Sequence, residues 1–454
     1  SDKGVLKIAP TLFKQYLQDN GFYKYCPAGS DEFVFVKVTN NLIKRTTKTK
    51  IKTFVLDFLE GLEDYSVFDY FSESVRFFRE EFLTFLDTID VFLVDDSEYE
   101  SYLYYRNCAV KVTREGVETI DYINLDGFVW KDRVIDRDFV KVDDDDCDYK
   151  TFISRISKDE KERINTMEST IGFLMHGYKN LSYCPAVILN DEVISDNPEG
   201  GTGKGLFVQG IQEIRKVAIL DGKSFDDKKS FPYQTVTQDT QTLVFDDVKK
   251  NFDFESKFSL VTEGLTLERK NKDAVKLTVE ESPKLVISTN YAIKGEGNSH
   301  DRRRFELEFA QYYGRDLTPY NEFKRELFDE WTEDDFIKFD NYMVKCIQYF
   351  MLNGLVNQNA KNLKLRKFIM ETAMDFYEWI EDKENFPIGV RNDKKLYFDN
   401  FTNEYKDFNK WLKRKRFDIW IQKYAKLKNL NYESGITNGM RWFMIGEEEE
   451  EMPF

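Results

Sequence analysis

The chain of 454 residues has few of the side chains that build metal centres and cross-links, with five cysteines and two histidines. The cysteines, at positions 26, 108, 147, 184 and 346, are odd in number and far apart, a pattern typical of free thiols in a reducing cytoplasm. With only His176 and His300, a zinc site or a nucleophile activated by histidine has too few groups to draw on. Both chemistries are therefore excluded.

Long apolar runs are also missing. No stretch approaches the roughly 18 apolar residues needed to cross a bilayer, and the N-terminus lacks the basic-then-apolar order of a secretion signal. We therefore expect no membrane partner and a cytoplasmic protein. The first residue is Ser1 rather than Met, which leaves open a fragment of a longer protein with a domain upstream.

The composition is that of a globular protein. Hydrophobic residues make up 41% and charged residues 33% of the chain, which excludes a disordered, collagen-like or coiled-coil protein. Length alone suggests about three domains of roughly 150 residues each. With 40 Phe and 25 Tyr, aromatic rings supply much of the expected core.

Charge is unevenly distributed along the chain. The 82 acidic residues exceed the 66 basic ones by 16, a balance that argues against nonspecific coating of nucleic acid. Any nucleic-acid site must therefore be local. Basic residues concentrate between Asn41 and Thr53, whereas Asp143–Asp148 is almost entirely acidic and predicts a linker. A solvated loop is the simple interpretation of the acidic run, and a metal or partner site is the alternative.

Periodicity divides the chain into three predicted domains. Residues 1–150 mix short apolar and charged stretches, as expected of an N-terminal accessory domain. Residues 151–315 begin with helical spacing and continue with brief β-branched runs, and residues 316–454 are again helical and aromatic. The brief runs are typical of buried parallel strands in an α/β sheet and lie at 185–189, 217–220, 243–245 and 285–288.

The sharpest motif is Asn197–Leu206, NPEGGTGKGL, which follows the first predicted strand and precedes a helical run. Glycines at such a turn let backbone N–H groups converge on phosphate, and the positive end of the helix adds to the attraction. Lys204 is expected to reach the β- and γ-phosphates of a nucleotide. The usual pattern GxxxxGK[ST] is broken by Pro198 at the first Gly and by Gly205 at the Ser or Thr that binds Mg²⁺. A chance glycine-rich turn is the alternative.

Polar residues follow the later strands. The apolar run after Thr242 ends in two carboxylates, an arrangement in which Asp246 holds Mg²⁺ and Asp247 polarises an attacking water. An ordinary exposed strand end is the alternative. The next apolar run ends in Asn290, which either orients that water or simply forms a turn. Three arginines, Arg302–Arg304, precede a last strand. They either form a surface cluster with no such role or neutralise phosphate charge across a subunit boundary.

A β-hairpin is predicted between the carboxylate strand and the strand that ends at Asn290. Alternating residues lead from Phe258 into the turn Lys270-Asn-Lys-Asp273 and continue to Lys276. A solvated hairpin without a ligand is the alternative interpretation.

In this order, the elements resemble the ATPase core of a superfamily III helicase, in the branch of phage, plasmid and poxvirus primase-helicases. The resemblance spans roughly Ile171–Phe309. It implies a P-loop, AAA+-like α/β core, ATP and Mg²⁺ as cofactors, and a homo-oligomeric ring, expected to be a hexamer. It also implies that the hairpin tip grips DNA in the channel of the ring through Arg269, Lys270, Asn271 and Lys272.

The resemblance further implies roles at the nucleotide. Lys204 contacts the phosphates, Asp246 binds Mg²⁺, Asp247 activates water and Asn290 acts as the sensor. Because Gly205 has no hydroxyl, water or Asp246 would have to complete the Mg²⁺ site. The residues so implied in ATP binding are Glu199, Gly200, Gly201, Thr202, Gly203, Lys204, Gly205 and Leu206.

By the same resemblance, Arg303 or Arg304 is the finger that acts on a neighbouring subunit. With Arg302 beside them, the sequence leaves open which of the three serves. His176 resembles a segment of the same branch upstream of the phosphate loop, and we expect a structural role for it.

Basic and aromatic residues are interleaved in residues 401–430, where nine Lys or Arg face three acids. The family often carries a winged-helix module in this region, so we expect a helical and winged-helix-like C-terminal domain. The aromatic residues are expected in its core. Phosphate contact and a merely solvated face are the two interpretations of Lys413, Arg414, Lys415 and Arg416.

The last residues, Gly446–Phe454, form the acidic tail GEEEEEMPF. Such a run is normally a solubilising tail, but one that closes on Pro-Phe resembles the tail tip of bacterial single-stranded-DNA-binding proteins. This resemblance implies recruitment of a replication partner.

Together these features predict an ATP-dependent DNA helicase of a phage or mobile element in a bacterial cytoplasm. The predicted ring translocates on single-stranded DNA and opens forked DNA during replication. Two alternatives stay open: a ring ATPase that remodels protein or loads a partner without unwinding, and a non-catalytic DNA-binding protein that retains the fold. The direction of travel and the ring size do not follow from the sequence.

Overall fold

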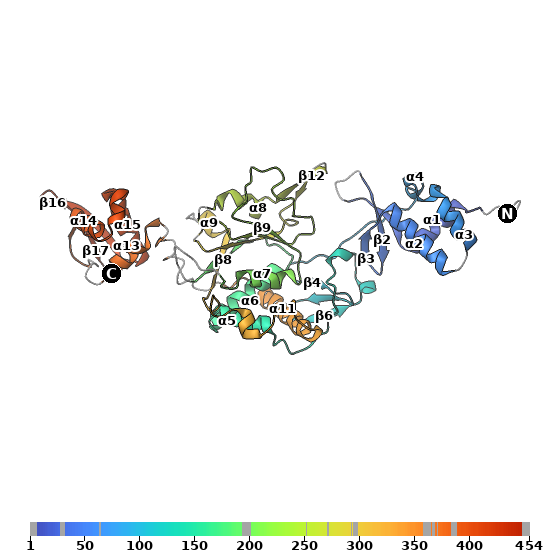
Figure 1. Cartoon of the computed structure of the whole chain (residues 1–454), viewed down its shortest axis with the longest axis horizontal. Coiled ribbons are helices and arrows are strands. Elements are labelled where there is room, and N and C mark those ends of the chain that lie inside the picture. The colour runs from blue at the N-terminus through green and yellow to red at the C-terminus, as the bar shows by residue number, and fades with distance from the viewer. Residues whose placement is uncertain are drawn as a thin grey trace, which may run out of the picture.

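The computed structural model places most of the chain in three groups of elements. Figure 1 shows the N-terminal elements at one end, a central sheet with its helices in the middle, and the C-terminal elements at the other end. No helix among the described residues is long and apolar enough to cross a membrane. The described residues are 7–27, 32–62, 65–192, 201–250, 252–269, 272–291, 293, 298–356, 365, 368–369, 371–382 and 388–446.

The N-terminal part is a four-stranded sheet packed with helices. Its elements are α1 (Pro10–Asp19), β1 (Phe22–Tyr25), β2 (Val34–Thr39), β3 (Leu42–Arg45), α2 (Lys48–Gly61), α3 (Tyr65–Glu73), α4 (Glu80–Leu83) and β7 (Val129–Trp130). The strand order is β1-β2-β3-β7, with β1, β2 and β3 antiparallel and β7 parallel to β3. Aromatic rings form the core, as in the contacts of Phe13 with Phe71 and Phe77.

A second, antiparallel sheet shares its core with helices that are distant in sequence. Leu103 and Val110 of this sheet are buried in the same cluster as apolar residues of three helices. The strands are β4 (Ser101–Tyr104), β5 (Ala109–Val112) and β6 (Val117–Ile120), and the helices are α5 (Asp148–Ile156), α6 (Lys161–Met175) and α11 (Glu333–Asn353). One core therefore extends across residues 150 and 315, where the sequence predicts domain boundaries.

The acidic run Asp143–Asp148 lies against α11. Asp144 forms an ion pair with Lys338 at 2.7 Å, and Asp145 pairs with Lys345 at 3.2 Å. Asp145 also pairs with Lys150 of α5 at 3.0 Å. Among the described residues, no group of three or more Asp, Glu, His or Cys side chains is placed to hold a metal ion. Ion pairs therefore hold the acidic run against lysines of α5 and α11.

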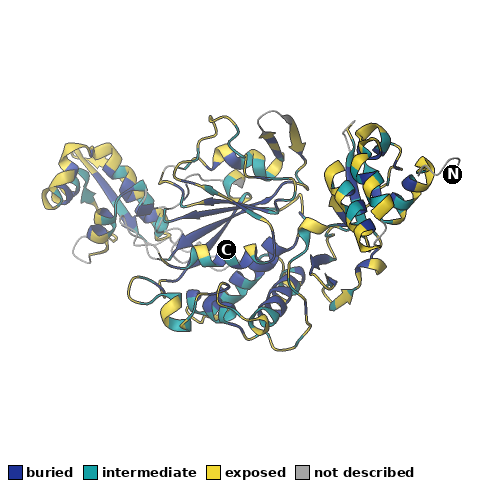
Figure 2. Cartoon of the chain, turned by 45° about the vertical axis from the view of Figure 1, so that its right-hand side comes forward, coloured by how far each residue is buried: buried dark blue, intermediate teal, exposed yellow. Residues whose placement is uncertain are grey.

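The central sheet has five strands in the order β14-β8-β13-β10-β9, and all of its pairings are parallel. Its strands are β8 (Ala186–Asp191), β9 (Val217–Asp221), β10 (Thr242–Asp246), β13 (Lys284–Thr289) and β14 (Arg304–Phe309). Every residue of β8, β13 and β14 is buried, and Figure 2 shows strands of the central sheet in dark blue. Burial on both faces explains the continuous apolar runs. The α/β class with a parallel sheet is confirmed.

Short helices and a hairpin connect these strands. The connecting elements are α7 (Lys204–Gln212), α8 (Phe258–Thr262), β11 (Leu265–Arg269), β12 (Lys272–Leu277), α9 (Asn298–Asp301) and, after the sheet, α10 (Pro319–Phe323). β11 and β12 pair antiparallel, with Leu265 opposite Leu277, so the predicted hairpin exists at its predicted place. Lys270 and Asn271 at its tip, and the side chains of Arg269 and Lys272, lie outside the described residues.

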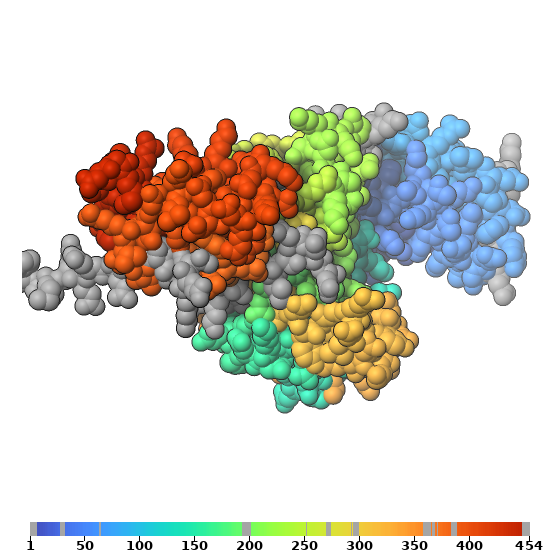
Figure 3. Space-filling model, turned by 60° about the vertical axis from the view of Figure 1, so that its left-hand side comes forward, coloured from blue at the N-terminus to red at the C-terminus, as the bar shows by residue number. Residues whose placement is uncertain are grey.

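The C-terminal part combines helices with a three-stranded antiparallel sheet of order β15-β17-β16. Its elements are α13 (Met374–Glu381), β15 (Asn392–Asp393), α14 (Lys394–Glu404), α15 (Arg414–Leu427), β16 (Asn431–Thr437) and β17 (Met440–Gly446). Phe401, Phe417 and Trp420 are buried in its core, whereas Trp411 is 48% exposed. In Figure 3 these elements form a lobe of their own.

Candidate active site

Polar side chains gather where the central strands end. Because β8, β13 and β10 are adjacent and parallel, their carboxyl ends meet at one edge of the sheet. Asp191 is the last residue of β8, Asp246 is the last residue of β10, and Asn290 directly follows β13. Since β13 lies between the other two strands, the backbone of Asn290 stands between those of Asp191 and Asp246.

The described half of the glycine loop leads directly into α7. Gly201 and Gly203 have φ angles of +80° and +100°, left-handed conformations that favour glycine. A Cβ atom on Gly203 would lie 2.7 Å from the ring of Phe152, so this position has no room for a side chain. Gly203 is the N-cap residue of α7, and Lys204 is its first residue. The predicted ATP-binding residues Glu199 and Gly200 lie outside the described residues.

The ammonium group of Lys204 is held between two strand ends. It donates hydrogen bonds to Asp191 Oδ1 at 2.5 Å and to Asn290 Oδ1 at 2.6 Å. The hydroxyl of Thr202 donates to the same carboxylate oxygen of Asp191. The Lys204 and Asp191 side chains are only 13% and 8% exposed, and shielding from water strengthens such a pair. The phosphate lysine and the sensor asparagine predicted from sequence therefore touch.

Asp191 is a site residue that the sequence reasoning missed. It ends a buried strand, as Asp246 does, and that position was the available signal. Its contact with Lys204 depends on the turn at Gly201–Gly203, which returns the chain to the strand end.

Ser288 of β13, also missed, connects the two carboxylates predicted from sequence. Its hydroxyl donates to Asp246 Oδ1 at 2.6 Å and accepts a hydrogen bond from the backbone N–H of Asp247 at 2.7 Å. Asp247 has a φ of +52°, and its carboxylate pairs with Lys223 at 2.5 Å. The neighbouring strand therefore fixes the geometry of both acids.

The oxygen atoms at this edge fit a magnesium ion shared with phosphate. Mg²⁺ in nucleotide sites is held by one or two carboxylates together with phosphate oxygens and water, and Asp246 is an exposed carboxylate at the strand end. Gly205 and Leu206 stand in the first turn of α7. Apart from its chain neighbours and the backbone of its own helix, no described residue has an atom within 4 Å of the place of a Cβ on Gly205, so a side chain meets no obstacle there.

The three arginines lie at the opposite edge of the sheet. Arg304 begins β14, whereas Phe309 at the other end of that strand pairs with Asp191. Five residues of strand separate these ends by about 16 Å. The arginines therefore lie about one strand length from the carboxyl edge where Lys204 meets Asp191.

The arginines differ in their surroundings. The side chain of Arg304 is 4% exposed and pairs with Asp301 at 3.0 Å and with Glu306 at 3.5 Å. Arg303 donates to the hydroxyl of Ser299 at 2.7 Å, and Arg302 is exposed. Arg304 thus stabilises its own strand, and Arg302 and Arg303 are better placed to meet a neighbour.

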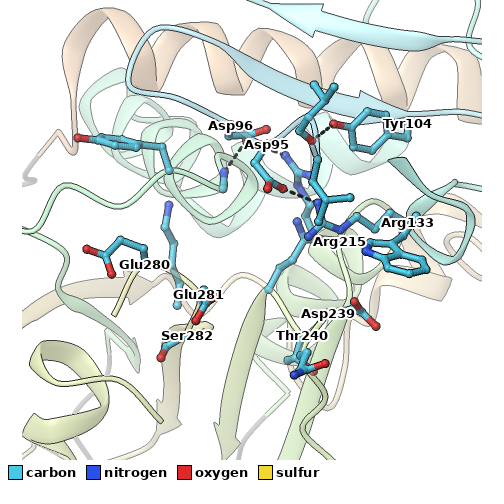
Figure 4. Close-up of a pocket in the computed structure, with 18 of the residues that line it drawn as sticks. Asp95, Asp96, Tyr104, Arg133, Arg215, Asp239, Thr240, Glu280, Glu281 and Ser282 are labelled. Carbon is cyan, nitrogen blue, oxygen red and sulfur yellow. Dashed lines mark hydrogen bonds and ion pairs between the residues drawn. The ribbon is translucent and has the colours of Figure 1, made fainter. Parts of the chain in front are cut away.

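A cavity of about 460 Å³ also lies at this amino-terminal edge of the sheet, away from Lys204 (Figure 4). Two ion pairs lie in its wall, since Arg133 contacts Asp95 at 2.5 Å and Arg215 contacts Asp96 at 3.2 Å. The pair of Arg215 with Asp96 connects a residue before β4 to one just before β9 of the central sheet. The cavity therefore lies where the region around β4 meets the central sheet.

Buried lysines and a histidine reinforce this junction. Lys284 donates to the carbonyl oxygen of Phe173 at 2.6 Å and also to that of His176. Burial lowers the pKa of Lys284 and that of Lys179, each to about 8. The Nε2 of His176 lies 2.8 Å from the carbonyl oxygen of Ser97, and burial lowers the pKa of this histidine as well. These contacts support the structural role expected for His176.

The predicted DNA contacts of the C-terminal part lie on one turn of helix. Lys413 is the N-cap residue of α15, and Arg414, Lys415 and Arg416 form its first turn, all four exposed. The guanidinium of Arg416 stacks over the exposed ring of Trp411 at 5.1 Å. These residues form a basic surface of their own and do not join the Lys204 site.

No family model matches the chain, and no curated protein matches it. Solved structures with similar shape include two apo structures of the C-terminal region of NrS-1. The first is 13% identical over 96% of this chain and 99% of that chain, with a TM-score of 0.45. The second is 14% identical over 97% and 100%, with a TM-score of 0.42. A helicase of JCV is 14% identical over 44% and 53%, with a TM-score of 0.27.

Proposed function

We propose that this chain is an ATP-dependent DNA helicase of a phage or mobile element. The observation that carries the proposal is the contact of Lys204, at the start of α7, with Asn290 and Asp191 beside the Asp246 strand. A glycine turn, a helix N-terminus, a lysine and strand-end carboxylates are the groups that phosphoryl transfer from a nucleotide requires.

In the proposed site, different residues bind the phosphates, hold the metal ion and orient the attacking water. The N-terminus of α7 and Lys204 bind the ATP phosphates, and Lys204 exchanges its contact with Asp191 for the phosphates. Asp246 is the protein ligand for Mg²⁺, which supplies charge neutralisation on the phosphates. Asp247 and Asn290 orient the attacking water. Ser288 keeps Asp246 in position through its hydrogen bond.

The position of the arginines supports a composite site between subunits. Arg302 and Arg303 lie one strand length from the phosphate loop of their own chain. A closed homo-oligomeric ring, for which we propose a hexamer, brings them to the loop of the next subunit. There a guanidinium neutralises charge that develops during transfer of the phosphoryl group.

We propose that this ring translocates on DNA. The β11–β12 hairpin carries the basic tip Arg269–Lys272 predicted from sequence and moves along one strand in the channel. Contacts with phosphates rather than bases make the grip insensitive to sequence. Lys413–Arg416 provides a second phosphate contact, and the acidic tail Glu447–Phe454, outside the described residues, recruits a replication partner.

A strand-displacement assay tests the proposal. Forked DNA with a single-stranded arm of either polarity is incubated with the parent chain, with ATP and Mg²⁺. We expect displacement on one of the two forks, and none with Lys204→Ala or Asp246→Ala. Lys161→Ala, an exposed lysine at the start of α6, serves as the control. ATP hydrolysis without displacement on either fork would favour a ring ATPase that acts on protein.

A further inference from the structure

Three lysines lie side by side on one face of the N-terminal sheet. The strand register places Lys37 of β2 directly opposite Lys44 of β3. Lys131 follows Trp130 of β7, and Trp130 pairs with Ile43 of β3, so Lys131 continues the row beyond Lys44. Like charges directly opposite each other destabilise a sheet. This row therefore costs stability unless an anion lies against it.

The three lysines line a groove of about 560 Å³ together with Arg106. Among the described residues that line this groove, Asp121 is the only carboxylate. Within the described part of the chain, none of the three lysines forms an ion pair, whereas Arg106 pairs with Asp138 at 2.8 Å. In a chain with a net charge of −16, such a local excess of cations is a distinct feature.

The lysines are held in place without carboxylates. The ammonium of Lys37 lies 4.0 Å from the ring centroid of Phe54 and 5.1 Å from that of Phe22, close enough for cation–π attraction. Burial and the nearby charge of Lys131 lower the pKa of Lys37. Lys44 and Lys131 are exposed, so a ligand reaches them from solvent.

We propose that this lysine groove, defined by Lys37, Lys44, Lys131 and Arg106, binds the phosphodiester backbone of single-stranded DNA. A nucleic-acid strand carries one negative charge per nucleotide, and the groove presents three ammonium groups in a row. The groove has the volume of a small-molecule site, so it accommodates a few nucleotides of one strand and excludes a duplex. The side chain of Ile123, 66% exposed at the groove, offers apolar contact to sugars or bases.

Binding of DNA in the lysine groove needs neither ATP nor ring assembly, because the groove lies within one chain and away from Lys204. It assigns a function to Lys44 of the basic segment Asn41–Thr53, which the ATP site and the hairpin do not use. The groove is expected to hold the strand outside the motor core and to do so without sequence preference.

The test measures binding of a fluorescein-labelled oligothymidylate to the full chain by anisotropy, without nucleotide, over a range of salt concentrations. We expect the double variant Lys44→Ala, Lys131→Ala to bind at least about tenfold more weakly. The slope of log K against log salt should fall by about 1.4, because each single-strand phosphate contact contributes about 0.7. Lys7→Ala, Lys161→Ala removes two exposed charges elsewhere and should leave both values unchanged.

Two further measurements separate charge from folding and DNA from other polyanions. The double variant Lys44→Arg, Lys131→Arg should retain binding, and all variants should share one thermal midpoint. An affinity and slope of the alanine variant equal to those of the control would overturn the proposal. Competition by oligoglutamate as strong as that by unlabelled DNA would also overturn it, in favour of an acidic peptide partner. If the parent chain binds DNA as expected but does not hydrolyse ATP, the result would count against the proposed helicase and not against the lysine groove.

Discussion

At the scale of single residues, the two acids that end β10 depend on a serine from the neighbouring strand. Ser288 contacts both the carboxylate of Asp246 and the backbone of Asp247. We expect Ser288→Ala to lower kcat for ATP hydrolysis by about 10-fold to 100-fold with a smaller change in KM, because groups that orient a metal ligand contribute that much. Steady-state kinetics measure this effect. Ser259→Ala, an exposed serine of α8, is the control, and full turnover by Ser288→Ala would contradict the assigned geometry.

A buried lysine makes stability depend on pH. Burial lowers the pKa of Lys284 from its usual 10.5 to about 8. Between these values the unfolded chain binds more protons than the folded one, so stability rises with pH in this window. Relative to Lys284→Met, the free energy of unfolding of the parent should rise by about 3 kcal/mol from pH 8 to pH 10.5.

Urea unfolding at several pH values measures this difference. The exposed Lys161→Met should show no such trend relative to the parent. A difference between the parent and Lys284→Met that stays constant from pH 8 to pH 10.5 would contradict the burial of a charged ammonium at this position.

Residue contacts were only partly predictable from sequence. Lys204, Asp246 and Asn290 were predicted as site residues because each stands next to a recognisable strand or glycine loop, and the structure places all three at one edge of the sheet. Their partners Asp191 and Ser288 were not predicted, because the contacts of these two residues depend on the position of β13 between β8 and β10. Strand order is a property of packing that local sequence patterns do not contain.

At the scale of elements, the first turn of α7 departs from the usual phosphate-loop pattern at Gly205. The turn is open around this residue, so a side chain is accommodated. We expect Gly205→Ser to lower the Mg²⁺ concentration for half-maximal ATP hydrolysis several-fold, since it restores the hydroxyl that holds the metal. Gly205→Ala adds the same Cβ without the hydroxyl and is the matched control. Equal Mg²⁺ dependence of the two variants would show that the metal is held without this position.

The elements themselves followed closely from the sequence where burial was uniform. The runs 185–189, 243–245 and 285–288 became β8, β10 and β13 because strands buried on both faces need continuous apolar residues. The antiparallel β4–β6 sheet was not predicted. Its strands are four residues each, and they pack on helices that come much later in the chain.

At the scale of the whole molecule, Lys204 lies at one edge of the central sheet and Arg302 and Arg303 lie at the other, so the proposed site takes its arginines from a second subunit. We expect Lys204→Ala and the double variant Arg302→Ala, Arg303→Ala each to lose ATP hydrolysis. Mixing the two proteins should restore part of it, because some interfaces then combine an intact loop with intact arginines. Steady-state hydrolysis of the mixture, compared with the average of the separate proteins, measures this recovery. A mixture no better than that average would contradict a shared site.

Acidic and basic side chains are distributed unevenly over the structure. Aspartates of the acidic run pair with lysines of α5 and α11, whereas Lys37, Lys44 and Lys131 share a groove with little acid. The net charge of −16 therefore coexists with a local basic groove, where we propose that single-stranded DNA binds. Such binding should weaken steeply as salt rises.

The central claim is that ATP hydrolysis at the Lys204 site is coupled to DNA. Its most direct test is the steady-state rate of ATP hydrolysis by the parent chain with Mg²⁺, measured with and without single-stranded DNA, beside Lys204→Ala. The account predicts turnover that DNA stimulates and that Lys204→Ala abolishes. No turnover by the parent chain in the presence of DNA, or equal turnover by Lys204→Ala, would contradict it.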